Sequence, residues 1–197
     1  MTRIENLSSK CVGCGVCAKV CTCDAITLRA DSTGFLYPHI DNEKCVSCGA
    51  CEDICPALNE INKVESKYYA VRCGDEEMLQ KSTSGGAFSL IADQIISDGG
   101  LVCGAVFDEE FKVKHIISSD YYQMRKSKYV QSDIAEVVDE IKKIISDGKK
   151  ILFSGTPCQC HAIKNYIGQN ENFVALFFLF DHIFIGEFAS SFISVVN

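Results

Sequence analysis

The sequence predicts a small α+β unit followed by an α/β unit. Three observations support this fold class: a cysteine motif occurs twice near the N-terminus, strands and helices alternate after it, and a polar stretch separates the two parts. That stretch is Asn59–Lys67, so we expect one domain over residues 1–60 and a second over residues 66–197. Hydrophobic residues make up 47% of the 197 residues, which excludes a wholly disordered chain.

Charge and cysteine content narrow the function classes. The chain has 19 Lys and Arg against 26 Asp and Glu, a formal net charge of −7. This balance argues against a nucleic-acid partner, because phosphate binding needs clustered positive charge. The 13 cysteines are an odd number, and the N-terminal residues hold no apolar stretch that could serve as a signal peptide. We therefore expect a cytoplasmic protein whose reduced thiols hold metal.

The apolar C-terminal stretch is not expected to be a membrane helix. Residues 173–196 are largely apolar, but Asp181, His182 and Glu187 interrupt them. A spanning helix needs about 20 mostly apolar residues without charges. No membrane partner is therefore predicted.

The cysteine motif has the same spacing in both copies. The first copy runs Cys-Val-Gly-Cys-Gly-Val-Cys-Ala-Lys-Val-Cys from Cys11, and the second runs Cys-Val-Ser-Cys-Gly-Ala-Cys-Glu-Asp-Ile-Cys from Cys45. The copies begin 34 residues apart and agree at six of 11 positions. This spacing is typical of bacterial ferredoxins, in which three close thiolates hold one 4Fe-4S cluster and the fourth cysteine binds the other cluster.

That rule predicts a bacterial ferredoxin-like domain with two 4Fe-4S clusters. The first cluster is expected on Cys11, Cys14, Cys17 and Cys55, and the second on Cys45, Cys48, Cys51 and Cys21. Gly15 and Gly49 keep the loops small, so that backbone N–H groups can approach the sulfurs. Pro56 follows the second copy as the pattern requires, whereas Thr22 follows the first.

Zinc is the alternative occupant of these sites. Zinc usually takes two cysteine pairs that a longer loop separates, rather than two dense quartets, so iron–sulfur clusters are favoured. Cys23 lies outside both quartets and is interpreted as a buried or bystander thiol.

Residue patterns predict the regular elements. Ala25–Asp41, between the two copies, is predicted to form two short strands around an Asp-Ser-Thr-Gly turn. Further strands are predicted over Lys67–Cys73, Leu101–Phe107, Phe111–Ser118, Lys150–Phe153 and Phe173–Phe180. Helices are predicted over Gly86–Ser97, with Ser84 as a cap, over Ile134–Ser146, and from a Ser-Gly-Thr-Pro-Cys-Gln loop to Ile167.

Two glycine-bearing loops in the second half each lead into a helix. They are Ser-Gly-Gly-Ala-Phe-Ser over residues 84–89 and Ser-Gly-Thr-Pro-Cys-Gln over residues 154–159. Free N–H groups and the positive end of the helix dipole favour anions at such a place, including phosphates. The Gly-x-Gly-x-x-Gly fingerprint is absent, so the residues alone indicate an anion or dinucleotide site.

These stretches resemble the coenzyme F420 hydrogenase/dehydrogenase beta-subunit family. The similar stretches are the cysteine repeat, SGGAFSLIADQIISDGGLVCGAVFD, SKYVQSD and ILFSGTPCQCHAIKNYIG, and they cover most of residues 5–175. The resemblance implies an iron–sulfur flavoprotein in which FAD mediates between the clusters and a two-electron carrier such as coenzyme F420. It also implies ferredoxin or a redox subunit as partner.

The resemblance further implies which residues hold the flavin. They are Ser84, Gly85, Gly86, Ala87 and Phe88 in the first loop, and Ser154, Gly155, Thr156, Pro157, Cys158 and Gln159 in the second. After Leu176 the sequence departs from the family pattern, and family members continue well beyond this length. We therefore expect the α/β unit to be incomplete at its C-terminus.

Several functions remain open from the sequence. The leading one is an oxidoreductase module with two 4Fe-4S clusters and a flavin, whose small-molecule electron carrier and catalytic residues are not identified. The alternatives are a ferredoxin-like electron-transfer protein without its own substrate site, and a truncated inactive fragment. Cys158 and His161 resemble a nucleophile pair, but no third orienting group is evident. Cys73 and Cys103 are expected in the core.

Overall fold

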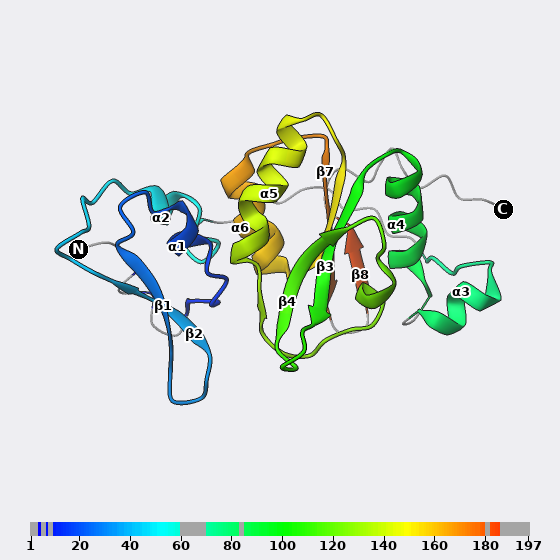
Figure 1. The fold of residues 1–197 in the computed structure, drawn as a ribbon, viewed down its shortest axis with the longest axis horizontal. Coiled ribbons are helices and arrows are strands. Elements are labelled where there is room, and N and C mark those ends of the chain that lie inside the picture. Colours follow the sequence, from blue (N-terminus) through cyan, green and yellow to red (C-terminus); the bar gives the residue numbers. More distant parts are fainter. Residues whose placement is uncertain are drawn as a thin grey trace.

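Two β-sheets organise the computed structural model of the chain (Figure 1). The structure describes Ile4, Leu7 and residues 10–59, 70–82, 85–179 and 182–185. A two-stranded sheet belongs to the N-terminal unit, and a six-stranded sheet forms the centre of the second unit. The expected boundary at Asn59–Lys67 lies largely outside the described residues.

The N-terminal unit contains a hairpin between the two cysteine motifs, as the sequence predicts. Strand β1 (Ile26–Ala30) pairs antiparallel with β2 (Leu36–Ile40), with Ile26 opposite Ile40. The Asp31 carboxylate accepts hydrogen bonds from the backbone N–H and the hydroxyl of Thr33, and Gly34 has φ +90°. An Asx-type turn of this kind favours a tight reversal of the chain.

Each cysteine motif ends in a short helix. Helix α1 (Val16–Val20) begins after Gly15, and α2 (Ala50–Asp53) begins after Gly49. Both glycines have left-handed backbone angles, φ +76° and φ +82°, which a residue with a Cβ adopts only at a cost. The repeat in sequence is therefore also a repeat in backbone geometry.

The second unit is built on a mixed six-stranded sheet in the order β5-β4-β3-β6-β7-β8. Strands β3 (Leu101–Phe107), β6 (Ile151–Gly155) and β7 (Phe173–Leu179) run parallel to one another. Strand β4 (Val113–Ser118) runs antiparallel to β3, β5 (Ser132–Asp133) parallel to β4, and β8 (His182–Ile185) antiparallel to β7. The parallel strands at the centre agree with the predicted α/β class.

Helices cover both faces of this sheet (Figure 1). Helix α4 (Ala87–Ser97) packs on one face with the 3-10 turn η3 (Tyr122–Met124), over a core that includes Phe88 and Leu152. Helices α5 (Ala135–Ser146) and α6 (Pro157–Ile167) pack on the other face, over a core that includes Phe153. Alternate residues of β6 thus enter opposite cores, as expected of a strand between two helical layers.

The N-terminal unit lies against the face that α5 and α6 cover (Figure 1). Helix α1 contacts both helices, and Val16 is buried in the same hydrophobic cluster as Ile141 and Ile163. The Lys19 ammonium lies 3.1 Å from the Asp139 carboxylate of α5. One hydrophobic core therefore extends across both units.

Two sequence-based expectations differ from the structure. The predicted strand Lys67–Cys73 is irregular over its described part, Ala70–Cys73, where the Cys73 N–H bonds instead to the Gly85 carbonyl. The N-cap of α4 is Gly86, whereas the predicted cap, Ser84, lies outside the described residues. Helix α3 (Glu76–Lys81), capped by the Asp75 carboxylate, was not predicted.

No helix within the described ranges is both long and apolar enough to cross a membrane.

Candidate functional site

Two cavities of the N-terminal unit are lined by cysteines from both copies of the motif. Cys11, Cys14 and Cys17 of the first copy line one cavity together with Cys55 of the second copy. Cys45, Cys48 and Cys51 of the second copy line the other together with Cys21 of the first copy. The structure thus groups the eight cysteines in the crossed sets of four that a two-cluster ferredoxin uses.

The donor set fits iron–sulfur clusters. The four motif thiols at each cavity match the four cysteine ligands of a 4Fe-4S cluster, and Cys23 also lines the second cavity. Over the ranges that the structure describes, no three His, Cys, Asp or Glu side chains converge closely enough to hold a single metal ion. All 13 cysteines are free, and no disulfide ties the thiols of either cavity.

The loops bend so that backbone N–H groups approach the sulfurs. The N–H of Gly13 interacts with the Cys11 thiol and that of Val16 with the Cys14 thiol. The N–H of Ala25 donates to Cys21 Sγ at 3.4 Å. Such hydrogen bonds stabilise thiolates and influence the reduction potential of a cluster that the thiolates hold.

Burial is the main electrostatic influence on the first set of thiols. It raises the pKa of Cys14 to about 11, with a smaller contribution from nearby Cys158, and raises the pKa of Cys17 to about 12. The pKa of Cys11 is also raised by burial, although the Gly13 N–H opposes this shift. Because metal ligands must be thiolates, loading of this cavity releases protons.

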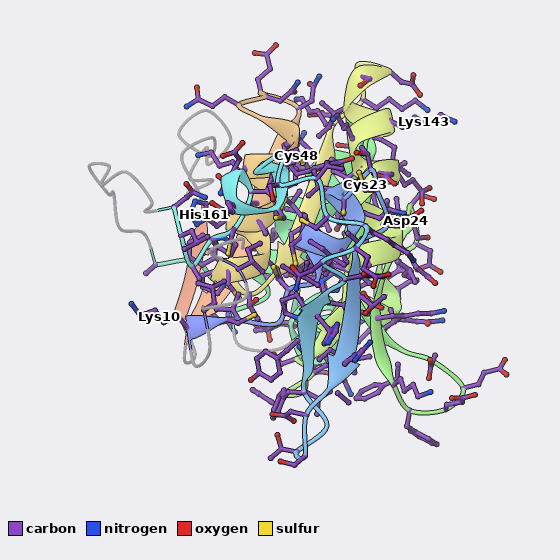
Figure 2. The ribbon with its side chains drawn as sticks, turned by 90° about the vertical axis from the view of Figure 1, so that its left-hand side faces the viewer. Lys10, Cys23, Asp24, Cys48, Lys143 and His161 are labelled. Atoms are coloured by element: carbon purple, nitrogen blue, oxygen red, sulfur yellow. The ribbon has the colours of Figure 1, made fainter. Side chains whose placement is uncertain are left out.

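The two cavities have different surroundings. Cys48 is exposed, and Val46 beside it exposes 67% of its surface. Figure 2, which faces the N-terminal unit, shows Cys48 on that side of the molecule, away from the six-stranded sheet. By contrast, Cys14 of the first set interacts electrostatically with Cys158 of α6. The first cavity therefore adjoins the second unit, and the second cavity adjoins solvent.

A glutamine of the second unit contacts the first cysteine loop directly. Gln131 Nε2 donates to the Gly13 carbonyl at 3.0 Å, and Gln131 Oε1 accepts from the Leu36 N–H at 3.2 Å. A Cβ at Gly13 would lie 2.8 Å from the Leu36 carbonyl oxygen and against Gln131 Nε2, and Gly13 has φ +63°, so glycine is favoured there. The corresponding residue of the second loop is Ser47, which is exposed and has φ +54°. The two cysteine loops therefore differ at this position, where the second unit contacts the first loop.

The Ser-Gly-Thr-Pro-Cys-Gln loop forms the N-terminus of α6, as predicted. Thr156 is the N-cap, Pro157 occupies the first turn, and the Thr156 N–H donates to Gln159 Oε1 at 3.0 Å. The Thr156 hydroxyl lies 3.0 Å from Cys158 Sγ. Ser154 and Gly155 end strand β6, so the loop lies at the carboxyl edge of the parallel strands.

The Ser-Gly-Gly-Ala-Phe-Ser loop leads to the N-terminus of α4. Because α4 precedes β3 and a tight turn reverses the chain between them, this N-terminus also faces the carboxyl edge of β3. Ala87 and Phe88 are buried, and Phe88 packs edge-to-face on Tyr121 with ring centroids 5.7 Å apart. Gly85 approaches the Val71 carbonyl so closely that a Cβ there would lie 2.3 Å from it. Among its described residues, Gly85 and Gly86 therefore offer only backbone groups.

Sequence reasoning missed three residues that organise this edge of the sheet. It assigned no role to Gln131 or Ser132 in the SKYVQSD stretch, although Gln159 Nε2 donates to Ser132 Oγ at 3.0 Å. The third residue is His115, which is buried, stacks on Phe153 and bonds through Nε2 to the Ser154 carbonyl at 2.9 Å. Burial lowers the pKa of His115, so its ring is neutral near pH 7.

Comparison with known proteins agrees with the geometry of the cysteine cavities. Residues 10–59 match the 4Fe-4S dicluster domain, so this part of the chain is an iron–sulfur electron-transfer domain of ferredoxin-like type, followed by an α/β unit. No curated protein sequence matches the chain.

Among solved structures, the chain is similar to one in the F420-reducing [NiFe] hydrogenase complex from Methanosarcina barkeri. The two are 25% identical, with a TM-score of 0.38. The alignment covers 46% of this chain and 33% of that one, so the matched part spans about a third of the neighbour's length.

Proposed function

We propose that this chain is an electron-transfer module in which each cysteine cavity holds one 4Fe-4S cluster. Cys11, Cys14, Cys17 and Cys55 hold the first cluster, and Cys21, Cys45, Cys48 and Cys51 hold the second. The observation that carries this proposal is the crossed grouping of the eight cysteines around the two cavities. Clusters of this type accept and donate single electrons at potentials that their surroundings set.

The protein's own groups prepare each site for its cluster. Left-handed backbone angles at Gly13, Gly15 and Gly49 curve the loops so that their thiols line the cavities. Amide groups such as the N–H of Ala25 stabilise the thiolates. Ile54 and Leu7 are buried and give the first cavity part of its apolar lining.

The contrast between the two cavities supports a route for the electrons. The second cavity adjoins solvent at Cys48, where ferredoxin or another redox subunit can approach. The first cavity adjoins Cys158 at the N-terminus of α6. Electrons therefore pass between an external partner and the second unit by way of both sites, in either direction.

We further propose that the second unit holds a flavin, FAD, at the carboxyl edge of β3 and β6. A flavin exchanges electrons singly with clusters and in pairs with a carrier such as coenzyme F420. The N-termini of α4 and α6 both face this edge, which is where open α/β sheets bind their ligands. At α6 Pro157 has no N–H and the Thr156 N–H bonds to Gln159, so the Cys158 N–H and the N–H groups of the Gly85–Gly86 loop are the donors for the flavin's phosphates.

Anaerobic reconstitution followed by counting iron and flavin tests both parts. About eight irons and one flavin per chain are expected. Eight irons without flavin would support the alternative of a ferredoxin-like electron-transfer protein without its own substrate site. A folded chain that retains no iron would overturn the proposal.

A Gly85→Val variant serves as the test of the flavin loop, because its side chain would collide with the Val71 carbonyl and displace the loop. Retention of iron with loss of flavin is expected. Gly74→Val is the matched control, because nothing lies within 4 Å of a Cβ at Gly74, and Gly74, like Gly85, does not have a positive φ.

A further inference from the structure

The second cysteine cavity has one thiol more than a cluster needs. Cys23 lines it together with Cys21, Cys45, Cys48 and Cys51, whereas four cysteines line the first cavity. We infer that Cys23 is a reserve ligand of the second cluster, able to bind iron in place of Cys21. This inference rests on the proposed function and adds to the second site a residue outside the repeated motif.

A single turn carries both thiols. The Asp24 N–H donates to the Cys21 carbonyl at 3.2 Å, which closes a turn over Cys21, Thr22 and Cys23. Asp24 has φ +50°, an angle that Asp adopts more readily than most residues with a Cβ. Because Cys21 and Cys23 are two residues apart in this turn, exchanging one thiol for the other requires only a local movement.

The far end of the turn is fixed beside the second cysteine loop. The Asp41 N–H donates to the Ala25 carbonyl at 2.8 Å, and the Asp41 carbonyl accepts from the Cys45 N–H at 3.0 Å. The backbone of Asp41 thus joins the residue two positions after Cys23 to the first ligand of the loop. Cys23 therefore stays at the cavity whichever thiol binds iron.

Hydrogen bonding makes Cys21 the resident ligand. Its sulfur accepts the N–H of Ala25 at 3.4 Å, which stabilises a thiolate at that position. Cys23 is half-buried and lies on the same outward side of the molecule as Cys48 (Figure 2). From there it can reach the iron when the Cys21 position is vacant.

The exchange is a substitution of one thiolate for another. The Cys23 thiol gives its proton to solvent and forms the new iron–sulfur bond, while the bond to Cys21 breaks and that thiolate takes up a proton. The number of protons and the charge of the site are unchanged, and no electron is transferred.

Iron counting on three reconstituted variants tests the inference. Cys23→Ala is expected to keep the wild-type iron content, because Cys21 remains. Cys21→Ala is expected to keep it as well, because Cys23 replaces the lost ligand. The double variant Cys21→Ala/Cys23→Ala is expected to lose half of the iron.

Cys55→Ala is the matched control, because the first cavity is lined by four cysteines, and loss of half of the iron is expected. Loss of half of the iron by Cys21→Ala alone would overturn the inference, and so would such a loss by Cys23→Ala alone. A folded wild-type chain without iron would instead overturn the proposed function.

Alkylation of the loaded protein gives a second measurement that does not depend on iron content. Cys23 is expected to react with iodoacetamide in the wild-type protein and to be protected in Cys21→Ala, where it binds iron. Equal reaction of Cys23 in both proteins would contradict its role as a ligand.

Discussion

Gln131 Nε2 donates a hydrogen bond to the carbonyl oxygen of Gly13 at 3.0 Å, across 118 positions of the sequence. Through its other amide atom Gln131 also accepts the N–H of Leu36. One side chain of the second unit thus holds both the first cysteine loop and the start of β2.

A second glutamine continues this connection to α6. Gln159 Nε2 donates to the Ser132 carbonyl at 3.1 Å, and Gln159 Oε1 accepts the Thr156 N–H. Because Ser132 follows Gln131 in the chain, the two amides link the first cysteine loop to the loop before α6. The relative position of the first cavity and Cys158 depends on this link.

Removal of the Gln131 side chain should loosen the first loop. Gln131→Ala leaves the Gly13 carbonyl and the Leu36 N–H without their partner, which costs about 1–3 kcal/mol. We expect the thermal midpoint of the loaded protein to fall by roughly 3–8 °C, measured from its visible absorption under anaerobic conditions. The exposed Gln123 of the same segment provides the control Gln123→Ala, and equal midpoints for both variants would contradict the role of the link.

Substitution of alanine at the two motif glycines should have unequal effects. Gly13 and Gly49 both have positive φ, so each alanine pays about 1 kcal/mol of backbone strain. Only at Gly13 does the new Cβ meet Gln131 Nε2 and, at 2.8 Å, the Leu36 carbonyl, whereas nothing lies within 4 Å at Gly49. Gly13→Ala should therefore cost about 2 kcal/mol more, measured by denaturant unfolding, and a similar cost for both would be unexpected.

Pairwise loss of cysteines should reveal which four serve each cluster. Cys11→Ala/Cys55→Ala removes two ligands of one cavity and should leave about four irons per chain. Cys11→Ala/Cys45→Ala removes one ligand from each cavity and should leave close to none. Both variants lack two thiols, so they control for each other. Loss of nearly all iron from both variants would show that each motif serves its own cluster.

The contact between α1 and α5 should be insensitive to pH across the neutral range. The Tyr166 hydroxyl bonds to the Asp139 carboxylate at 2.7 Å, and with Lys19 it holds the pKa of Asp139 below its usual value. The same bond raises the pKa of Tyr166 to about 12. The contribution of Asp139 to stability is thus lost only as pH falls below about 4, and that of Tyr166 only as pH rises from about 10 through 12.

Asp139→Asn should accordingly lower the free energy of unfolding by the same small amount, about 0.5 kcal/mol, at every pH from 5 to 9. Unfolding by urea at several pH values in this range measures the difference. Glu140→Gln removes a charge at the next position of α5 and serves as the control. A difference that changes between pH 5 and pH 9 would refute the assignment.

The cysteines of the second unit should react with alkylating reagents in a fixed order. Burial raises the pKa of the Cys103 and Cys160 thiols well above the usual value, which lowers the fraction of reactive thiolate. Cys158 is partly exposed at the start of α6. We expect it to react with iodoacetamide at least about tenfold faster than Cys160, measured by peptide mass spectrometry. In the unfolded chain the two rates should be alike.

Much of the fold could be predicted because its signals are local. The apolar periodicity over Ile134–Ser146 and the continuous apolar run from Phe173 specify a helix and an inner strand without reference to the rest of the chain. The predicted strand before Cys73 failed because strands depend on partners, and the Cys73 N–H bonds to the Gly85 carbonyl instead. Sequence patterns carry no information about such a partner.

The candidate site likewise has one part that the sequence predicted and one part that it did not. Cysteine spacing alone separated the eight thiols into the two sets that line the cavities, because a short loop leaves few ways to wrap a cluster. Gln131 could not be identified as a contact of Gly13, because nothing local distinguishes it from the exposed Gln123. The available indication of this contact in the sequence was that the first motif has Gly13 where the second motif has Ser47.

Helix α1 shares a hydrophobic core with α5 and α6. We therefore expect the cell's iron supply to affect how long the whole protein persists. A group that binds the folded chain but not the unfolded one raises the free energy of unfolding. Since Val16 and Cys17 lie in the same cluster as Ile141, stabilisation at the first cavity reaches the second unit. Cells short of iron should therefore degrade this protein faster, so its abundance follows the iron that the cell holds.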